Sequence, residues 1–565
     1  MIIPIAPRRP HLLGGVLLAL AFLLILHQTY TPHGVLSSSF PRTKQHPHTL
    51  THGLEKGNNE ILQRLSHMRG VCESEDPFDR EYGRANLRLS RAYEGSHERM
   101  RLFLQKLLRG EHVTISAIGG SITKGHQVDK SEIWFHKFWE WLRDFAGDNV
   151  EIVEINGAAP ATGSDYFSFC FPLHIPSDSD LVIVELAVND EGILEHIENM
   201  ENLIRGLLDL PNNPAVMLVE ALAFSGGGMG GGGGRMHLPV AQYYDVPVIN
   251  HRHPLVSHFA RHPQLVEPYF TKDWWQNPDK RHINPRGHRD LGMLVASFVK
   301  DVACEMFAEP TFSVQPAPSF PLLLSQAIAQ PPQTSDPAEG LAEDERRRQE
   351  EALWPEQAKS WRRPPKEGEE VGELMPSLWS TPQDYGIVPR LRVLEGWNPN
   401  TEYATPPFHP TCLSTRSKEP RFNLTPSYND GWEYWIHPEH LDKPYMVARE
   451  PGARVSFELE TGVGMVKMYA LKSKTFGLGT VECWADEERD KAEKIVGWWD
   501  NGDVNIGRFA TIRTGLSAGT HTITCELLEE TSDPGGGHEF RMISMMRCVS
   551  FSTMLGLYTD HESSV

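Results

Sequence analysis

The stretch GGSIT, residues 119–123, places one serine directly after two glycines, at the end of the β-forming run VTISAI, residues 113–118. A serine hydroxyl becomes a nucleophile when a base removes its proton and an acid orients that base. Asp279 and His282 are separated by two residues, so one loop can hold the carboxylate against one imidazole nitrogen. Ser121, His282 and Asp279 are therefore the candidate nucleophile, base and orienting acid.

Attack on a carbonyl carbon creates an oxyanion that needs fixed hydrogen-bond donors. The segment NGAAPATG, residues 156–163, ends on Gly163, whose N–H has no Cβ in its way. The segment AVND follows a buried apolar run and supplies Asn189, whose side-chain amide carries two N–H groups. Together with the Ser121 N–H these would form a three-donor oxyanion hole, and Gly157 is a competing glycine.

These segments resemble the four sequence blocks of the SGNH hydrolases, the GDSL-type esterase and lipase superfamily. GGSIT resembles the first block, NGAAPATG the second, AVND the third, and DKRHINPRGH, residues 279–288, the last. The resemblance covers about residues 95–305 and implies a flavodoxin-like α/β/α sandwich with carboxylic ester hydrolase activity that uses neither cofactor nor metal. The sequence departs from the family pattern at Gly120, which replaces an acidic residue, at Ala187, which replaces a glycine, and in the long gap before Gly163.

Each candidate residue also has a purely structural interpretation. Ser121 is compatible with an ordinary strand-to-helix turn. Asn189 could cap a helix beginning in EGILEHI, a role that Asp190 could take instead. Asp279 could be a turn former, which would leave a serine–histidine dyad. His288 is expected to be a structural partner and not a second base.

Around the candidate residues, β-forming runs alternate with helical runs such as residues 98–110. Strands that are apolar on both faces and separated by helices indicate a parallel sheet covered on each side. We assign this α/β domain to residues 81–306. The glycine-rich stretch 225–234 lacks P-loop spacing, so we expect a surface loop there.

The C-terminal part has a different pattern. Residues 388–558 contain short alternating runs without helices, such as HTITCEL, residues 521–527, and this is typical of a β-sandwich. Its tryptophans could fill the core or form a carbohydrate-binding platform. Residues 307–387 are rich in Pro, Glu and Gln and are expected to be a disordered linker. Asn423 begins an N-L-T sequon and is a candidate glycosylation site.

The N-terminus suggests membrane attachment. Arg8 and Arg9 precede an apolar run over residues 12–26, so residues 1–30 are expected to be a signal anchor and residues 31–80 a stem. This predicts a single-pass type II protein on the luminal side of the Golgi or secretory pathway. A cleaved signal peptide, which would give a secreted protein, is the alternative.

Composition narrows the range of partners and sites. A net charge of −20 disfavours a nucleic-acid partner. Seven cysteines show neither C-x-x-C pairs nor zinc spacing, and their odd number leaves at least one without a partner in the chain. The histidines of residues 251–262 lack the H-E-x-x-H arrangement, so no metal site is expected there.

The combined expectation is a membrane-anchored luminal serine esterase. Its substrate would be an acylated glycan or another ester, from which it removes O-acyl groups, O-acetyl in particular, of glycans or glycoproteins. One alternative is an O-acyltransferase, in which a sugar hydroxyl replaces water. Another is a non-catalytic carbohydrate-binding protein that retains the fold.

Overall fold

The computed structural model describes residues 47–147, 149–224, 231–273, 276–310, 312–314, 392–394, 410–438, 440–461, 464–500 and 505–548. The chain divides into two compact units, Met1–Asn59 and Glu60–Val565, and both domains described below belong to the second. The predicted anchor and most of the predicted linker lie outside the described residues. None of the helices in the described ranges is both long and apolar enough to cross a membrane.

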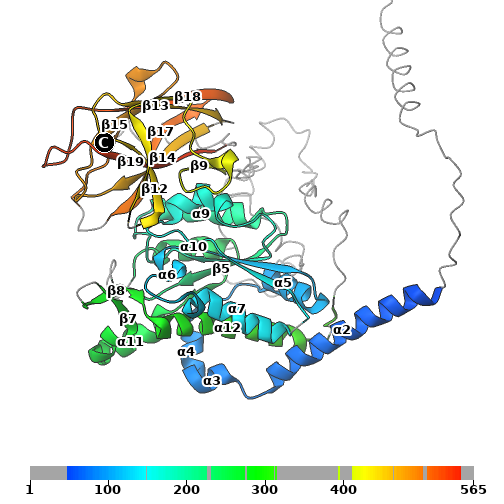
Figure 1. Ribbon diagram of the computed structural model, residues 1–565. Coiled ribbons are helices and arrows are strands. Elements are labelled where there is room, and N and C mark those ends of the chain that lie inside the picture. The colour runs from blue at the N-terminus through cyan, green and yellow to red at the C-terminus, as the bar shows by residue number, and fades with distance from the viewer. Residues whose placement is uncertain are drawn as a thin grey trace, which may run out of the picture. The chain divides into compact units, whose positions relative to one another are not determined.

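The N-terminal half of the second unit is an α/β domain, seen in Figure 1 around the label β5. Its strands are β1 (Arg91–Tyr93), β2 (Val113–Gly119), β3 (Ile152–Asn156), β4 (Leu181–Glu185), β5 (Ala215–Glu220), β6 (Val248–Asn250), β7 (Phe270–Lys272) and β8 (Pro278–Ile283). Its helices are residues 60–73 of α2 (Pro47–Glu73), α3 (Pro77–Tyr82), α4 (Arg84–Leu89), α5 (Glu98–Arg109), α6 (Ser121–Lys124), α7 (Trp134–Ala146), α8 (Ser164–Cys170), α9 (Glu195–Leu208), α10 (Gly234–Tyr243), α11 (Arg252–Arg261) and α12 (Pro285–Ala308).

Six of these strands form one sheet in the order β1-β6-β5-β4-β2-β3. Strands β2 to β6 are parallel, whereas β1 adds an antiparallel edge. Without β1 the order is that of the flavodoxin-like doubly wound sheet, so the predicted fold class is confirmed. The carboxyl ends of the parallel strands meet at one edge, and this is where such sheets place their functional groups.

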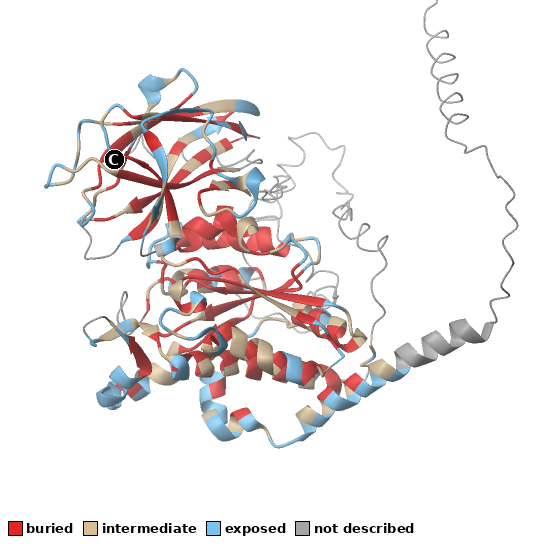
Figure 2. Cartoon of the chain, viewed as in Figure 1, coloured by how far each residue is buried: buried red, intermediate tan, exposed pale blue. Residues whose placement is uncertain are grey.

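Successive side chains of each strand point to opposite faces of the sheet, so both faces are apolar. Helices cover each of them. Val113, Ile115 and Ala117 of β2 pack in one core with α5, α7 and α12. Ile118 of the same strand joins the other core with α8, α9 and α10. Figures 1 and 2 show the two helical layers and the almost wholly buried strands between them.

The C-terminal β-domain consists of two antiparallel sheets. One has the order β10-β13-β18-β15-β16, and the other has the order β11-β12-β19-β14-β17 with β9 beside β19. Its strands are β9 (Pro410–Ser414), β10 (Tyr428–Asp430), β11 (Trp432–His437), β12 (His440–Ala448), β13 (Arg454–Thr461), β14 (Gly464–Lys472), β15 (Thr480–Ala485), β16 (Glu493–Val496), β17 (Ile506–Leu516), β18 (Gly519–Leu527) and β19 (Phe540–Cys548). Residues from both sheets share one apolar core, as expected of a β-sandwich.

The two domains are packed against each other through α8. Tyr166 of α8 lies with its ring centroid 5.0 Å from that of Tyr469 in β14, and both side chains are fully buried. A disulfide joins Cys170 of α8 to Cys412 of β9, which are 242 residues apart in the sequence. The β-domain is thus attached to the helix that begins next to the candidate oxyanion glycine, Gly163.

The segment predicted as a stem differs from expectation near its end. Met68 is fully buried in the α/β core, and Cys72 forms a disulfide with Cys304 of α12. Residues 60–80 therefore belong to the packed α/β domain. The sequence did not indicate this, because the apolar residues of α2 are few and follow a charged, Ser- and Pro-rich segment. A third disulfide joins Cys483 and Cys525 on neighbouring strands of the β-domain.

Candidate active site

Ser121 and His282 come together at the carboxyl edge of the sheet. Ser121 is the first residue of α6, directly after β2 and Gly120. His282 lies on β8, 161 residues later, and its Nε2 is 2.7 Å from the Ser121 Oγ. At this distance the imidazole can accept the hydroxyl proton, which is the first requirement for a serine nucleophile.

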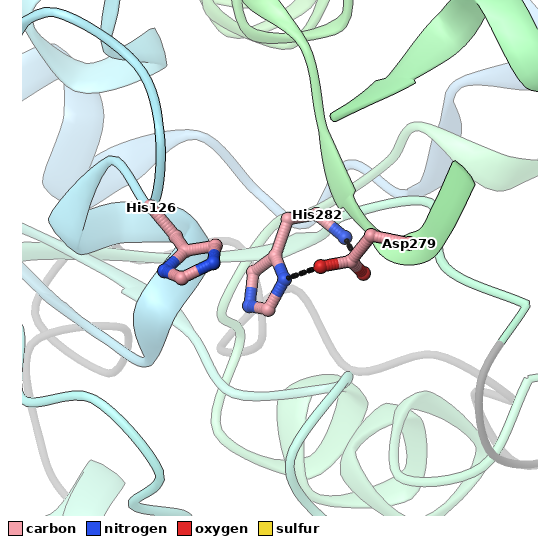
Figure 3. Close-up of side chains that lie close together, drawn as sticks. All are labelled: His126, Asp279 and His282. Carbon is pink, nitrogen blue, oxygen red and sulfur yellow. Dashed lines mark hydrogen bonds and ion pairs between the residues drawn. The ribbon is translucent and has the colours of Figure 1, made fainter. Parts of the chain in front are cut away.

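Asp279 binds the opposite side of the same imidazole (Figure 3). Its Oδ2 lies 2.5 Å from the His282 Nδ1, while its Oδ1 accepts hydrogen bonds from the backbone N–H groups of Arg281 (2.8 Å) and His282 (3.0 Å). Lys280 adopts a φ of 58°, which turns the backbone so that the carboxylate meets the imidazole three residues further along. Asp279 is thus held in one orientation by the backbone of its own segment of β8.

The charge balance of this pair favours the carboxylate. Burial would raise the pKa of Asp279, but the hydrogen bond from His282, the electrostatic interaction with that imidazole and the two backbone N–H groups lower it to about 2. Asp279 therefore stays ionised at any physiological pH. An ionised partner holds the proton on Nδ1 and leaves Nε2 free to accept a proton from Ser121.

The Asn189 side chain lies beside Thr162 and Gly120, the residues that directly precede the two other candidate donors, Gly163 and Ser121. Its Nδ2 donates to the carbonyl of Thr162 at 2.6 Å, and a Cβ added to Gly120 would lie only 2.6 Å from the same nitrogen. The residue before Ser121 must therefore be small. The second N–H on Asn189 Nδ2 is left for an oxyanion, and the Ser121 and Gly163 N–H groups have no hydrogen-bond partner among the described residues.

The structure distinguishes between the two glycines of the second block. The N–H of Gly157 donates to the carbonyl of Ala117 at 2.9 Å, so it is occupied in extending the backbone pairing of β2. Gly163 instead precedes α8, where a Cβ would lie 2.2 Å from the Asp190 Oδ1. Gly163 is therefore the glycine that fits the donor role, and its lack of a Cβ is required by this close approach.

Asp190 has a role that the sequence interpretation missed. Helix α9 begins at Glu195, so neither Asn189 nor Asp190 caps it. Asp190 instead accepts a hydrogen bond from the Ser164 N–H at 2.8 Å, and its other oxygen lies 2.7 Å from the Nε2 of His237 on α10. This buried contact fixes the backbone next to the candidate oxyanion glycine, Gly163.

Two other titratable groups lie beside the nucleophile. Glu185, at the end of β4, accepts a hydrogen bond from the Thr123 hydroxyl at 2.9 Å, and burial raises the pKa of Glu185 to about 8. The exposed His126 lies with its ring centroid 4.2 Å from that of His282 (Figure 3). No spacing rule connected either residue with the site, because both contacts depend on how the loops fold over the sheet edge.

The structure also shows the environments of the other histidines that the sequence singled out. The His288 Nδ1 accepts a hydrogen bond from the Trp134 N–H at 3.2 Å, so His288 is a structural partner. Ligand atoms of His126, Asp279 and His282 lie within 4.8 Å of one another. A metal there would have to break a hydrogen bond of His282, since both of its ring nitrogens are engaged. His251 is buried, unlike the exposed His258 and His262.

The other sequence-predicted positions lie in the β-domain. Asn423 of the sequon is exposed directly after a short 3-10 helix, Pro420–Phe422. Trp432 and Trp484 are buried, Trp432 in the apolar core of the domain, whereas Tyr434 is 56% exposed. These two tryptophans therefore serve packing rather than an open carbohydrate platform.

No protein-family profile matches the sequence, and no curated protein is similar to it. Among solved structures, the fold is similar to a two-domain esterase active on acetylated mannans, with 16% identity, a TM-score of 0.54, and coverage of 82% of this chain and 99% of that chain. A structure of such an esterase co-crystallized with mannopentaose gives 17% identity, a TM-score of 0.53, and coverage of 82% and 98%. The similarity includes both domains, so the whole two-domain architecture is shared.

Proposed function

We propose that this protein is a serine hydrolase of the SGNH type that removes O-acyl groups, O-acetyl in particular, from glycans or glycoproteins. The observation that carries the proposal is the continuous hydrogen-bonded chain from Ser121 through His282 to Asp279. In this reaction the Ser121 Oγ attacks the acyl carbonyl carbon while His282 takes its proton. His282 then returns the proton to the departing sugar oxygen, and water releases the acyl group from the serine.

The oxyanion formed at each step would be held by the N–H groups of Ser121 and Gly163 and by the Asn189 amide. Similarity to an esterase active on acetylated mannans supports a glycan as the alcohol part of the ester. The β-domain also supports this, since it packs on α8 and so borders the site where a large substrate would lie.

The decisive experiment measures hydrolysis of a small acetyl ester and release of acetate from an acetylated glycan by the full chain. Ser121→Ala should lower both rates by at least about a thousandfold, because it removes the proposed nucleophilic oxygen. Ser517→Ala, at an exposed serine of the β-domain, is the matched control and should leave both rates unchanged. Equal rates for wild type and Ser121→Ala would refute the proposal.

We also propose that this reaction takes place in the lumen of the secretory pathway, with residues 1–30 as the membrane anchor. Three disulfides support an oxidising compartment. Cell fractionation tests the placement: recovery of the protein in carbonate-washed membranes supports it, and recovery in the cytosol contradicts it.

A further inference from the structure

A cavity of about 260 Å³ lies between the loop that leads to Gly163 and the β11-β12-β19-β14-β17 sheet of the β-domain. Pro160 and Ala161 line it from the α/β domain, and Ala161 is only two residues before Gly163. From the β-domain come Arg416, Lys443 of β12 and Arg541 of β19, among others. The cavity therefore borders the candidate oxyanion hole without including any of the proposed catalytic groups.

Positive charge dominates this cavity, since none of the described residues lining it is acidic. The charge of Arg541 is balanced, because its guanidinium is 2.5 Å from Glu539 and stacks on Trp435. Arg416 is different: its Nε and Nη1 are buried and have no hydrogen-bond partner among the described residues, and its guanidinium lies 5.7 Å from the centre of the Tyr166 ring.

Arg416 as a whole is half-buried, but its Nε and Nη1 have lost their hydration without gaining an acceptor, and this is costly even beside the Tyr166 ring. Arginine presents its N–H groups in a planar fork that matches the oxygens of a carboxylate, sulfate or phosphate. An anion in the cavity would therefore supply the acceptors that Arg416 Nε and Nη1 lack, and Lys443 would add positive charge around it.

The cavity also lies within electrostatic reach of His126, which contacts the candidate base His282. Burial is the main cause that lowers the pKa of His126, and the charges of His282 and Lys443 lower it further. The His126 and His282 rings are in contact, with their centroids 4.2 Å apart. Because Ala161, two residues before Gly163, also lines the cavity, we expect one substrate molecule to reach both the cavity and the candidate site.

We propose that this cavity binds an anionic group of the glycan substrate, a uronate carboxylate or a sulfate or phosphate ester, while a nearby acyl ester lies at Ser121. This inference rests on the proposed esterase function and narrows its substrate class to acidic acylated glycans. The volume is just below the range of roughly 300–1,000 Å³ typical of pockets for drug-sized ligands. It therefore suits about one charged sugar residue, with the rest of the chain outside.

The test is a calorimetric titration of the full chain with methyl glucuronoside, methyl glucoside and inorganic sulfate. The glucuronoside or sulfate should bind at least tenfold more tightly than the glucoside, and Arg416→Gln should weaken that binding at least tenfold. Binding of the glucuronoside identifies a carboxylate as the natural group, whereas binding of sulfate alone identifies a sulfate or phosphate ester. Arg421→Gln is the matched control, because Arg421 is 73% exposed, pairs with Glu419 and does not line the cavity.

The proposal is overturned if neither anion binds more tightly than the glucoside, or if Arg416→Gln binds the anion as well as wild type does. Should circular dichroism show that Arg416→Gln is unfolded, Lys443→Gln provides the same comparison. Ser121→Ala separates this inference from the proposed function, since it should bind the anion normally and hydrolyse nothing. Anion binding by a wild-type chain without esterase activity would refute the esterase function alone, and activity without anion binding would refute the anion site alone.

Discussion

Replacing Asp279 by asparagine should lower kcat more than replacing it by alanine does, although asparagine has nearly the same shape as aspartate. Oδ1 of Asp279 accepts from the N–H groups of Arg281 and His282, while Oδ2 accepts from the His282 Nδ1. In Asp279→Asn the two backbone donors should keep the remaining oxygen in the Oδ1 position, because they need an acceptor. The new NH₂ group would then point at Nδ1 of His282.

An NH₂ group facing Nδ1 favours the tautomer that carries its proton on Nε2. That tautomer cannot accept the Ser121 proton, so the base is lost even though the geometry is preserved. For comparable triads this error costs up to about ten-thousandfold in kcat. We expect Asp279→Asn to lose at least about a hundredfold in kcat.

Asp279→Ala removes the charge without imposing the wrong tautomer. The pKa of Asp279 falls from 3.8 to about 2, a net shift of roughly 2–3 kcal/mol to which the interaction with His282 and the two backbone N–H groups contribute the lowering. Solvent reaches the pair, with side-chain exposures of 14% for His282 and 16% for Asp279, so screening reduces this to about 1–2 kcal/mol. The expected loss in kcat is about 5- to 30-fold.

The assay is steady-state hydrolysis of a small acetyl ester at pH 8 by wild type and both variants. Because the pKa of Asp279 is lowered, the interaction is fully present above about pH 4 and is lost only as the pH falls towards 2, so pH 8 measures all of it. Circular dichroism checks that both variants are folded. If Asp279→Asn is as active as Asp279→Ala, or more so, the assigned hydrogen-bond arrangement is wrong.

Two further predictions concern groups beside the nucleophile. Asn189→Ala should lower kcat for a small ester by about 10²–10³ with a smaller change in KM, since the amide acts on the oxyanion and not on the ground state; a change confined to KM would contradict the donor role. Burial raises the pKa of Glu185 from 4.5 to about 8, so the folded state prefers the neutral carboxyl group. The contribution of this group to the free energy of unfolding is therefore fully present below pH 4.5 and is lost as the pH rises through 8. Glu185→Gln should therefore raise Tm over wild type by at least about 2 °C at pH 8.5 but not at pH 4.5, and a difference that is the same at both values would count against this.

Much of the architecture could be predicted from the sequence. The buried run of β2 and the amphipathic helix α5 have the expected position and type, because period-2 and period-3.6 patterns are local. Residues 60–80 were misassigned to a stem. A single methionine in a largely charged helix does not indicate burial by itself, and only the structure shows that Met68 packs in the α/β core.

The candidate site was predictable where its contacts are short in sequence. Asp279 and His282 are three residues apart on one strand, so their hydrogen bond follows from the local backbone once Lys280 turns it. The order of the four segments also indicated which residues would meet. Residues such as His237 gave no comparable signal, because a histidine on a helix face is compatible with many environments.

The sequence by itself determined the type of sheet and the order of its strands and helices, and it singled out the candidate nucleophile, base and acid. Only the tertiary structure decided that the N–H of Gly157 is paired while that of Gly163 has no partner among the described residues, and that Asn189 does not cap α9. The same holds for Arg416, whose buried Nε and Nη1 lack an acceptor within the described part of the chain. The physical reason is that each of these depends on a hydrogen-bond partner or a burial that a distant segment brings, and spacing along the chain does not encode such contacts.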